Sequence, residues 1–224
     1  FAGSFLGLSF LSLSEKLALV RAIRAIEHER GRADLDRITM QQWLDEKHQP
    51  PRVIERFWRQ VLVSAINEEL DRMAAAHGFQ VFWLGFLASK TSYEMGVPAV
   101  PLGKLYSSEA WQRLGNVEIR LRAPVSRVAI RDGVAHAAIT GGEEIGGDYV
   151  ISAVPFERAG ALCPELGLDV NAFEHSPITG IHLWFDRPVT DLPHATLLDR
   201  TIQWMFNKHE GRYVQLVVSA SRNL

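Results

Sequence analysis

The spacing of the apolar residues changes once along the chain, near residues 96–98, and this change constrains the fold most strongly. Before it, apolar residues recur at helical intervals, as Leu13, Leu17 and Val20 do. After it, one more helical stretch is followed by short alternating runs that are typical of strands. The sequence therefore predicts a mixed α/β (α+β) chain with a helical part over residues 1–100 and sheets beyond it.

Capping patterns mark where several helices begin. Ser12 and Glu15 have the spacing of a capping box, and Thr39 and Gln42 repeat it. Pro51 suits the first turn of a third helix. Further helices are expected over residues 56–69, 73–89 and 101–115.

Turn residues divide the second half into short strands. Asp132-Gly133 predicts a two-residue hairpin, and HEGR at 209–212 predicts another. The cluster GGEEIGGD at 141–148 is interpreted as a turn before a buried strand. Strands are expected over residues 117–125, 126–133, 134–142, 149–155, 178–189, 201–208 and 213–221.

Composition excludes several classes of function. The 24 basic and 26 acidic residues nearly cancel, so nothing indicates a nucleic-acid partner. Cys163 is the sole cysteine, which excludes an internal disulfide and favours a reducing compartment. The histidines are scattered without ligand spacing, so no metal site is expected. Neither Gly-x-Gly-x-x-Gly nor a phosphate-binding P-loop occurs, so these residues alone do not name a reaction.

One long unit resembles a known family. LRAPVSRVAIRDGVAHAAI followed by DYVISAVP resembles the middle of the flavin-binding domain in the flavin amine oxidase and carotenoid desaturase superfamily. The resemblance implies FAD as cofactor. It implies that the backbone of Val125 hydrogen-bonds the adenine, and that Ala153 and Pro155 approach the flavin phosphates or ribose. The strand 149–155 would then return the chain to a substrate domain.

Three stretches narrow the resemblance. Residues 56–69, 148–165 and 176–208 are similar to bacterial squalene-associated flavin desaturases, understood as hydroxysqualene dehydroxylases. This implies reductive dehydroxylation of hydroxysqualene to squalene for hopanoid or sterol synthesis. The rivals are a phytoene-desaturase-like or amine-oxidase-like flavin enzyme, and a non-catalytic lipid-binding remnant without flavin.

The same resemblance implies a domain plan. Residues 1–100 would be the helical part of the substrate domain, 101–160 the middle of the FAD-binding domain, and 161–224 the substrate-domain sheet. The glycine-rich FAD motifs expected at the two ends are missing from the 224 residues. We therefore expect a fragment that is inactive by itself.

Aromatic residues on neighbouring strands are candidate substrate contacts. Trp184, Trp204 and Phe206 would line the substrate cavity that the family builds on this sheet, with ordinary core packing as the alternative. No catalytic residue is identified outright. His182 is a candidate to protonate the departing hydroxyl, because its ordinary pKa lies near neutrality.

The partners expected from the resemblance are a polyisoprenoid substrate and other enzymes of squalene synthesis. Polyisoprenes leave a membrane to reach the flavin, so we expect a cytoplasmic protein with peripheral contact at the inner membrane face. Asp199 and Glu174 are further acid candidates. Aromatic residues of one apolar helix would form a tunnel wall or ordinary core, and these are Phe79, Phe82, Trp83 and Phe86.

Overall fold

The computed structural model describes residues 5, 7–94, 96 and 98–224, and it divides into two compact units. The first unit combines Phe1–Met95 with Ser176–Leu224, and the second is Gly96–His175. Val97, inside the predicted change of pattern, lies outside the described residues, as do most of the first six. The predicted flavin segment 101–160 falls within the second unit.

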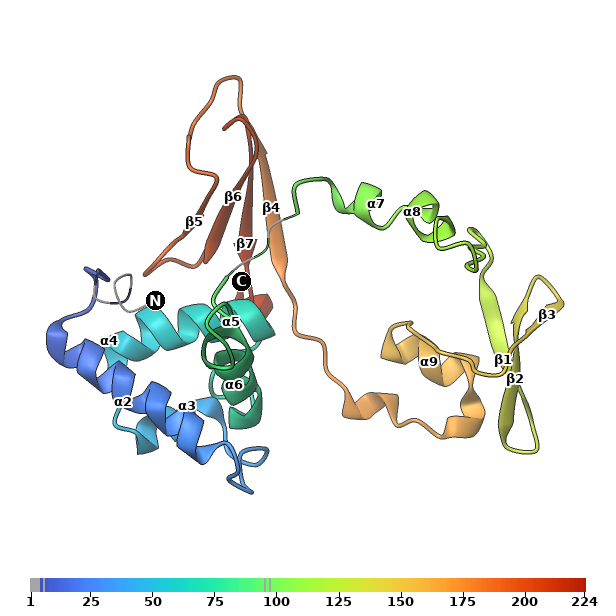
Figure 1. The fold of residues 1–224 in the computed structure, drawn as a ribbon, viewed down its shortest axis with the longest axis horizontal. Helices are drawn as coiled ribbons and strands as arrows, with labels where there is room; N and C mark the ends of the chain where they lie inside the picture. Colours follow the sequence, from blue (N-terminus) through green and yellow to red (C-terminus); the bar gives the residue numbers. More distant parts are fainter. Residues whose placement is uncertain (1–4, 6, 95, 97) are drawn as a thin grey trace. The chain divides into compact units, whose positions relative to one another are not determined.

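Local signals in the sequence account for the helices of the first unit (Figure 1). Ser12 and Glu15 cap α2 reciprocally, and Thr39 and Gln42 cap α3 in the same way, which confirms both predicted capping boxes. Pro51 occupies the first turn of α4, as predicted. The helices are α2 (Leu13–Glu29), α3 (Met40–Glu46), α4 (Pro51–Val53), η1 (Ile54–Arg59), α5 (Gln60–Ile66), α6 (Ala75–Phe82) and η2 (Trp83–Leu87).

Two of these segments, η1 and η2, are π-helical turns. η1 continues directly into α5, and η2 follows directly on α6. The helices predicted at 56–69 and 73–89 therefore form, but each contains a widened turn that the sequence pattern did not indicate. Such turns are rare in proteins, and those that occur are often found at functional sites.

Four aromatic side chains form the centre of the helical core. Trp43 meets Trp58 and Phe79 edge-on, with ring centroids 6.1 Å and 4.9 Å apart. Phe82 packs on Trp58 at 4.6 Å. Trp43, Trp58 and Phe82 are completely buried. Gln49 satisfies the one polar atom of the Trp58 ring, because its amide oxygen accepts a 2.9 Å hydrogen bond from the indole nitrogen.

An antiparallel sheet of strand order β4-β7-β6-β5 completes the first unit. The predicted hairpin at 209–212 forms between β6 and β7. Gly211 has φ +74, and a Cβ there would lie 2.4 Å from the carbonyl oxygen of Thr190, so only glycine fits the turn. The strands are β4 (Thr179–Trp184), β5 (His194–Thr196), β6 (Trp204–His209) and β7 (Tyr213–Val218), followed by the 3₁₀ turn η5 (Ser221–Asn223).

Asn67 ties both ends of this sheet to the helices. It ends α5 in the left-handed conformation, with φ 61. Its side-chain amide donates to the carbonyl of Ser176 at 2.6 Å and accepts from the amide of Ala220 at 2.8 Å. One side chain thus fixes the chain just before β4 and just after β7.

The second unit is built around a three-stranded antiparallel sheet of order β1-β2-β3. Asp132 and Gly133 form the predicted β1–β2 turn with φ of 51 and 77. The strands are β1 (Val125–Arg131), β2 (Val134–Thr140) and β3 (Glu143–Gly146). The helices are α7 (Leu102–Leu105), α8 (Ser108–Gln112), α9 (Phe156–Leu162), η3 (Pro164–Leu166) and η4 (Val170–Ala172).

Several expectations for the second unit are wrong. The single helix expected at 101–115 is two short helices, because Ser107 begins α8 as a new N-cap. The strand expected at 117–125 is absent before Val125. Its charged residues pair at the surface instead, and Arg122 breaks the extended backbone with φ 55.

The stretch YVISAVP is also not a strand. Residues 149–155 have no strand partner among the residues described, and Tyr149 and Ile151 are 91% and 90% exposed. Part of the cluster interpreted as a turn, 143–146, forms β3 instead. A strand requires a neighbour for its N–H and C=O groups, and apolar content alone does not supply one.

Candidate functional site

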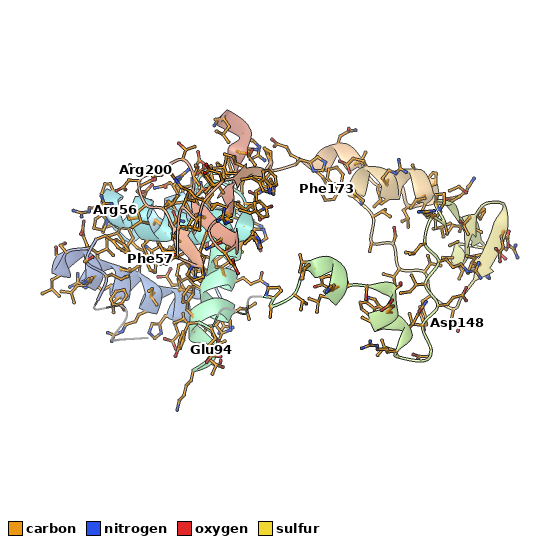
Figure 2. All side chains as sticks on the ribbon, turned by 90° about the horizontal axis from the view of Figure 1, so that it is seen from above. Arg56, Phe57, Glu94, Asp148, Phe173 and Arg200 are labelled. Atoms are coloured by element: carbon orange, nitrogen blue, oxygen red, sulfur yellow. The ribbon has the colours of Figure 1, made fainter. Side chains whose placement is uncertain are left out.

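The first unit contains an apolar cavity of about 740 Å³ between its helices and its sheet. A cavity of this size lies within the range of small-molecule sites, about 300–1,000 Å³. Figure 2 labels Arg56, Phe57 and Arg200 in the region where these helices and the sheet meet. The lining residues are Phe10, Arg56, Phe57, Gln60, Val61, Ser64, Ala65, Phe86, Tyr93, Ile178, Thr196, Leu198, Trp204, Phe206, Val217 and Ser219.

One continuous helical face, η1 with α5, forms a long wall of the cavity. Phe57, Val61 and Ala65 recur every four residues and supply an apolar row. Both π-helical segments contribute a phenylalanine to the lining, Phe57 from η1 and Phe86 from η2. Each widened turn therefore places one phenylalanine at the cavity.

A second row on the same helical face is polar, and it joins the helix to the chain around β6. Gln60 donates from its amide nitrogen to the carbonyl of Gln203 at 3.3 Å. Ser64 accepts a 2.9 Å hydrogen bond from the indole nitrogen of Trp204. We call these two contacts, together with the ion pair of Arg56 and Asp199, the polar seam. Figure 1 shows α5 beside the ends of β6 and β7, where the seam lies.

The ion pair of Arg56 and Asp199 closes the other end of the polar seam. The guanidinium donates from Nε and Nη2 to the two carboxylate oxygens at 3.0 Å and 2.6 Å. Asp199, an acid candidate from the sequence, is therefore engaged as an acceptor. Its backbone has φ 57, so the loop is shaped to present this carboxylate.

The charges around the cavity do not suit a cationic ligand. Of the described lining residues, Arg56 alone carries a charge, and that charge is positive and paired with Asp199. The polar atoms of the seam are directed at one another. An uncharged, apolar molecule could therefore enter without leaving a buried polar group unpaired.

A second, polar hollow has a volume of about 520 Å³. It shares Ser219 with the cavity lining and Asp199 with the polar seam. Two of its charged groups pair with each other: Arg59 donates two hydrogen bonds to Glu69, at 3.0 Å and 2.6 Å. Those bonds raise the pKa of Arg59 above its ordinary value. The hollow therefore has no unpaired charge from Arg59 or Glu69 with which to hold a ligand.

Of the predicted substrate residues, Trp204 and Phe206 lie in the cavity wall. Their rings stack with centroids 5.6 Å apart. Trp184 lies outside the lining and is 72% exposed, stacked on Tyr213 at 4.9 Å. His182 is exposed beside them, and its Nδ1 lies 2.6 Å from the Tyr213 hydroxyl. Their roles as contacts or as an acid stay predictions.

The four aromatic residues that were expected to form a tunnel wall lie in different places. Phe86 lines the cavity, whereas Phe79 and Phe82 are buried in the core. Trp83 is covered by the guanidinium of Arg30 at 3.6 Å from its ring centre. The polar residues of η1 and α5 were missed from the sequence. Their four-residue spacing, Arg56, Gln60 and Ser64, was the available signal.

The predicted cofactor residues lie in the second unit. Val125 begins β1 and is 40% exposed. Ala153 and Pro155 are exposed in the extended run before α9. For residues 149–154 no backbone hydrogen bond to another part of the described chain occurs, so these N–H and C=O groups are accessible to a ligand. The residues present thus fit one edge of a cofactor site through the main chain.

The fold matches a solved oxidoreductase. A crystal structure of an oxidoreductase from Methanosarcina mazei superposes with a TM-score of 0.72 at 17% identity, covering 99% of this chain and 55% of that one. A 15-cis-phytoene desaturase from Synechococcus elongatus is 25% identical over 178 residues, 72% of this chain and 37% of the relative. The chain thus spans about a third to a half of these proteins.

The class of protein is given by a family model that matches nearly the whole chain. The model of the family of flavin containing amine oxidoreductases matches residues 2–221. The chain belongs to this family, and the family implies a flavin cofactor. At the level of the superfamily this confirms the resemblance found in the sequence.

Proposed function

We propose that the chain is part of an FAD-dependent oxidoreductase that converts hydroxysqualene to squalene by reductive dehydroxylation. The observation that carries this proposal is the apolar cavity between the helices and sheet of the first unit. A polyisoprenoid arm needs a site of this volume and of this lack of free polar groups.

The cavity favours a hydrocarbon over an amine. A protonated amine would lose its hydration and meet Arg56, the nearest charged group in the lining, which repels it. The aromatic rings of Trp204 and Phe206 could attract a cation, but no carboxylate is free to pair with it in the described wall. An amine-oxidase-like activity is therefore the less favoured of the flavin chemistries.

A phytoene-desaturase-like activity is the nearer alternative. The relative from Synechococcus elongatus carries that name, and a carotenoid precursor would suit the same apolar lining. The two activities differ in redox direction, because desaturation removes hydride from a hydrocarbon whereas dehydroxylation delivers hydride to one. The lining does not decide between them. The similarity of residues 56–69, 148–165 and 176–208 to the dehydroxylases supports the second.

The protein's part in the reaction is binding, orientation and exclusion of water. When bound, reduced FAD supplies hydride. Val125 at the end of β1 and Ala153 in the unpaired run would hold the cofactor through main-chain groups. Pro155, whose carbonyl accepts from the amides of Arg158 and Ala159, would approach the cofactor by contact alone. Phe57, Val61 and the other apolar lining residues would hold one hydrocarbon arm and exclude water around it.

The substrate also bears on the protein's surroundings. Squalene-like molecules reside in membranes, so we propose that the protein receives its substrate at a membrane surface, beside the enzymes that make it. None of the described helices is both long and apolar enough to cross a bilayer. Contact with the membrane would therefore be peripheral for this part of the chain.

A substrate panel tests the proposal. The whole protein of which this chain is a part is loaded with flavin and incubated without oxygen with hydroxysqualene, phytoene or benzylamine, each with oxidised and with reduced flavin. We expect squalene from hydroxysqualene with reduced flavin and no conversion in the other five mixtures. Conversion of phytoene by oxidised flavin would favour the desaturase. A protein that binds squalene but takes up no flavin would favour the lipid-binding remnant.

A further inference from the structure

The cavity wall continues along one face of the sheet to a hydrogen-bonded histidine and tyrosine. Directly opposed residues in antiparallel strands share a face. Trp204 pairs with Val217, which pairs with Gly180, and these form one row across the sheet. Two positions along the strands, the next row on the same face contains Phe206 and His182, on either side of Gln215. His182 is therefore on the cavity face, two strands or about 10 Å from Phe206.

Gly180 leaves a gap in this face between the cavity and His182. Its neighbour Val217 lines the cavity, and Gly180 itself has no side chain. A Cβ placed on Gly180 would lie 3.5 Å from Nε2 of His182 and 3.9 Å from Nε2 of Gln215. The imidazole Nε2 therefore borders the gap, and the amide of Gln215 is its neighbour toward the row that lines the cavity.

The other imidazole nitrogen is held by Tyr213. Nδ1 of His182 lies 2.6 Å from the tyrosine hydroxyl, and the two rings stack with centroids 5.9 Å apart. The ring of Trp184 lies beside both, with its centroid 4.9 Å from that of Tyr213 and 6.1 Å from that of His182. Because Nδ1 is engaged and the rings are stacked, the imidazole has one orientation and its Nε2 is available to a ligand.

We propose that His182 is the catalytic acid that protonates the hydroxyl of an allylic alcohol lying over Gly180, and that Tyr213 is its positioning residue. This inference rests on the proposed function. Hydroxysqualene carries its hydroxyl near the middle of the chain. One arm would occupy the apolar cavity, and the carbinol would lie over the gap at Gly180, beside Nε2.

With reduced flavin as the reductant, the proposed reaction balances in protons and electrons. Imidazolium His182 gives up the proton on Nε2 to the substrate oxygen while Nδ1–H donates to Tyr213. The C–O bond breaks and water leaves. Reduced flavin, when bound, would supply the hydride that the allylic carbon takes up, which balances the reaction as reduction of carbon and oxidation of flavin. Because His182 is exposed, solvent returns its proton.

The test compares His182→Gln with His28→Gln in the flavin-loaded whole protein. His28 is an exposed histidine on α2, and it is not in the cavity lining. We expect His182→Gln to slow single-turnover formation of squalene by about 10²–10⁴-fold, the usual contribution of a general acid. The dissociation constant for squalene should stay within about twofold of the parent value in both variants.

Tyr213→Phe tests the positioning role by a second readout. It should change the ¹⁵N shifts of the His182 imidazole, because Nδ1 loses its partner, and it should lower the single-turnover rate without changing squalene binding. Unchanged ¹⁵N shifts would remove Tyr213 from the proposal. A His182→Gln variant that reacts within threefold of the parent would overturn the acid role alone. A parent protein that does not consume hydroxysqualene would refute the proposed function as well.

Discussion

The indole nitrogen of Trp204 donates a 2.9 Å hydrogen bond to the hydroxyl of Ser64, and this bond joins the sheet wall of the cavity to its helical wall. The two residues are 140 positions apart in the sequence. This hydrogen bond, together with the other bonds of the polar seam, fixes the distance between the two walls.

Ser64→Ala is expected to destabilise the protein by about 1 kcal/mol, because the half-buried indole N–H of Trp204 loses its acceptor. Urea unfolding followed by tryptophan fluorescence measures the change. Ser64→Thr keeps the hydroxyl and is the matched control. Equal stability of the alanine variant and the parent would mean that the bond is not formed in solution.

Asn67 should tolerate glycine better than alanine. Both substitutions remove the hydrogen bonds to Ser176 and Ala220. Alanine also strains the left-handed backbone at φ 61, at a further cost of about 1 kcal/mol. We therefore expect the free energy of unfolding to fall in the order parent, Asn67→Gly, Asn67→Ala. The reverse order of the two variants would contradict the left-handed geometry.

Glu29 should make the helical core sensitive to acid. Partial burial raises the pKa of this carboxyl, but hydrogen bonds from Lys47, Trp43 and Arg32 outweigh burial and leave it below its ordinary value of 4.5. A depressed pKa in the folded state means that the unfolded chain binds the proton first as pH falls. The stabilisation is therefore complete above about pH 4.5 and is lost as pH falls through the folded value.

Glu29→Gln is accordingly expected to cost about 1–3 kcal/mol at pH 7, and less as the pH is lowered below about 4.5. Urea titrations at several pH values measure this difference. Glu27→Gln, an exposed change on the same helix, should shift stability by less than about 0.5 kcal/mol. A Glu29→Gln deficit that is constant from pH 7 to pH 3 would show that the carboxylate charge contributes nothing.

Val61→Trp should fill the cavity from its helical wall. We expect the affinity for squalene to fall by at least about tenfold, or 1.4 kcal/mol. Equilibrium binding of tritiated squalene measures this. Leu84→Trp adds the same ring at an exposed site that is outside the lining, and it should leave the affinity unchanged. Parallel losses in both variants would place the bound hydrocarbon elsewhere.

The sequence was sufficient where a signal is local. The capping residues Ser12 and Thr39 act within four positions, and the turn at Asp132 needs only its own backbone geometry. The polar seam could not be foreseen, because the contact between Ser64 and Trp204 depends on how the sheet meets the helices. Trp204 was predicted as a substrate contact because it is aromatic, whereas Arg56 was not predicted to be a site residue.

The stretch YVISAVP shows the limit of apolar patterning. It is a short apolar run of the kind found in buried strands, yet residues 149–155 are mostly exposed and without a strand partner in the described chain. Pairing is a long-range property, and the pattern of one segment cannot supply it. The π-helical turns η1 and η2 were missed for a related reason, since a widened turn leaves the apolar periodicity nearly unchanged.

A single anaerobic turnover tests the central claim most directly. The flavin-loaded protein is reduced completely, mixed with one equivalent of hydroxysqualene, and followed by flavin absorbance while squalene is quantified in the quenched mixture. We predict that one squalene forms for each flavin oxidised, at the same rate. Flavin that stays reduced in the presence of hydroxysqualene, or squalene formed by fully oxidised protein, would contradict the account.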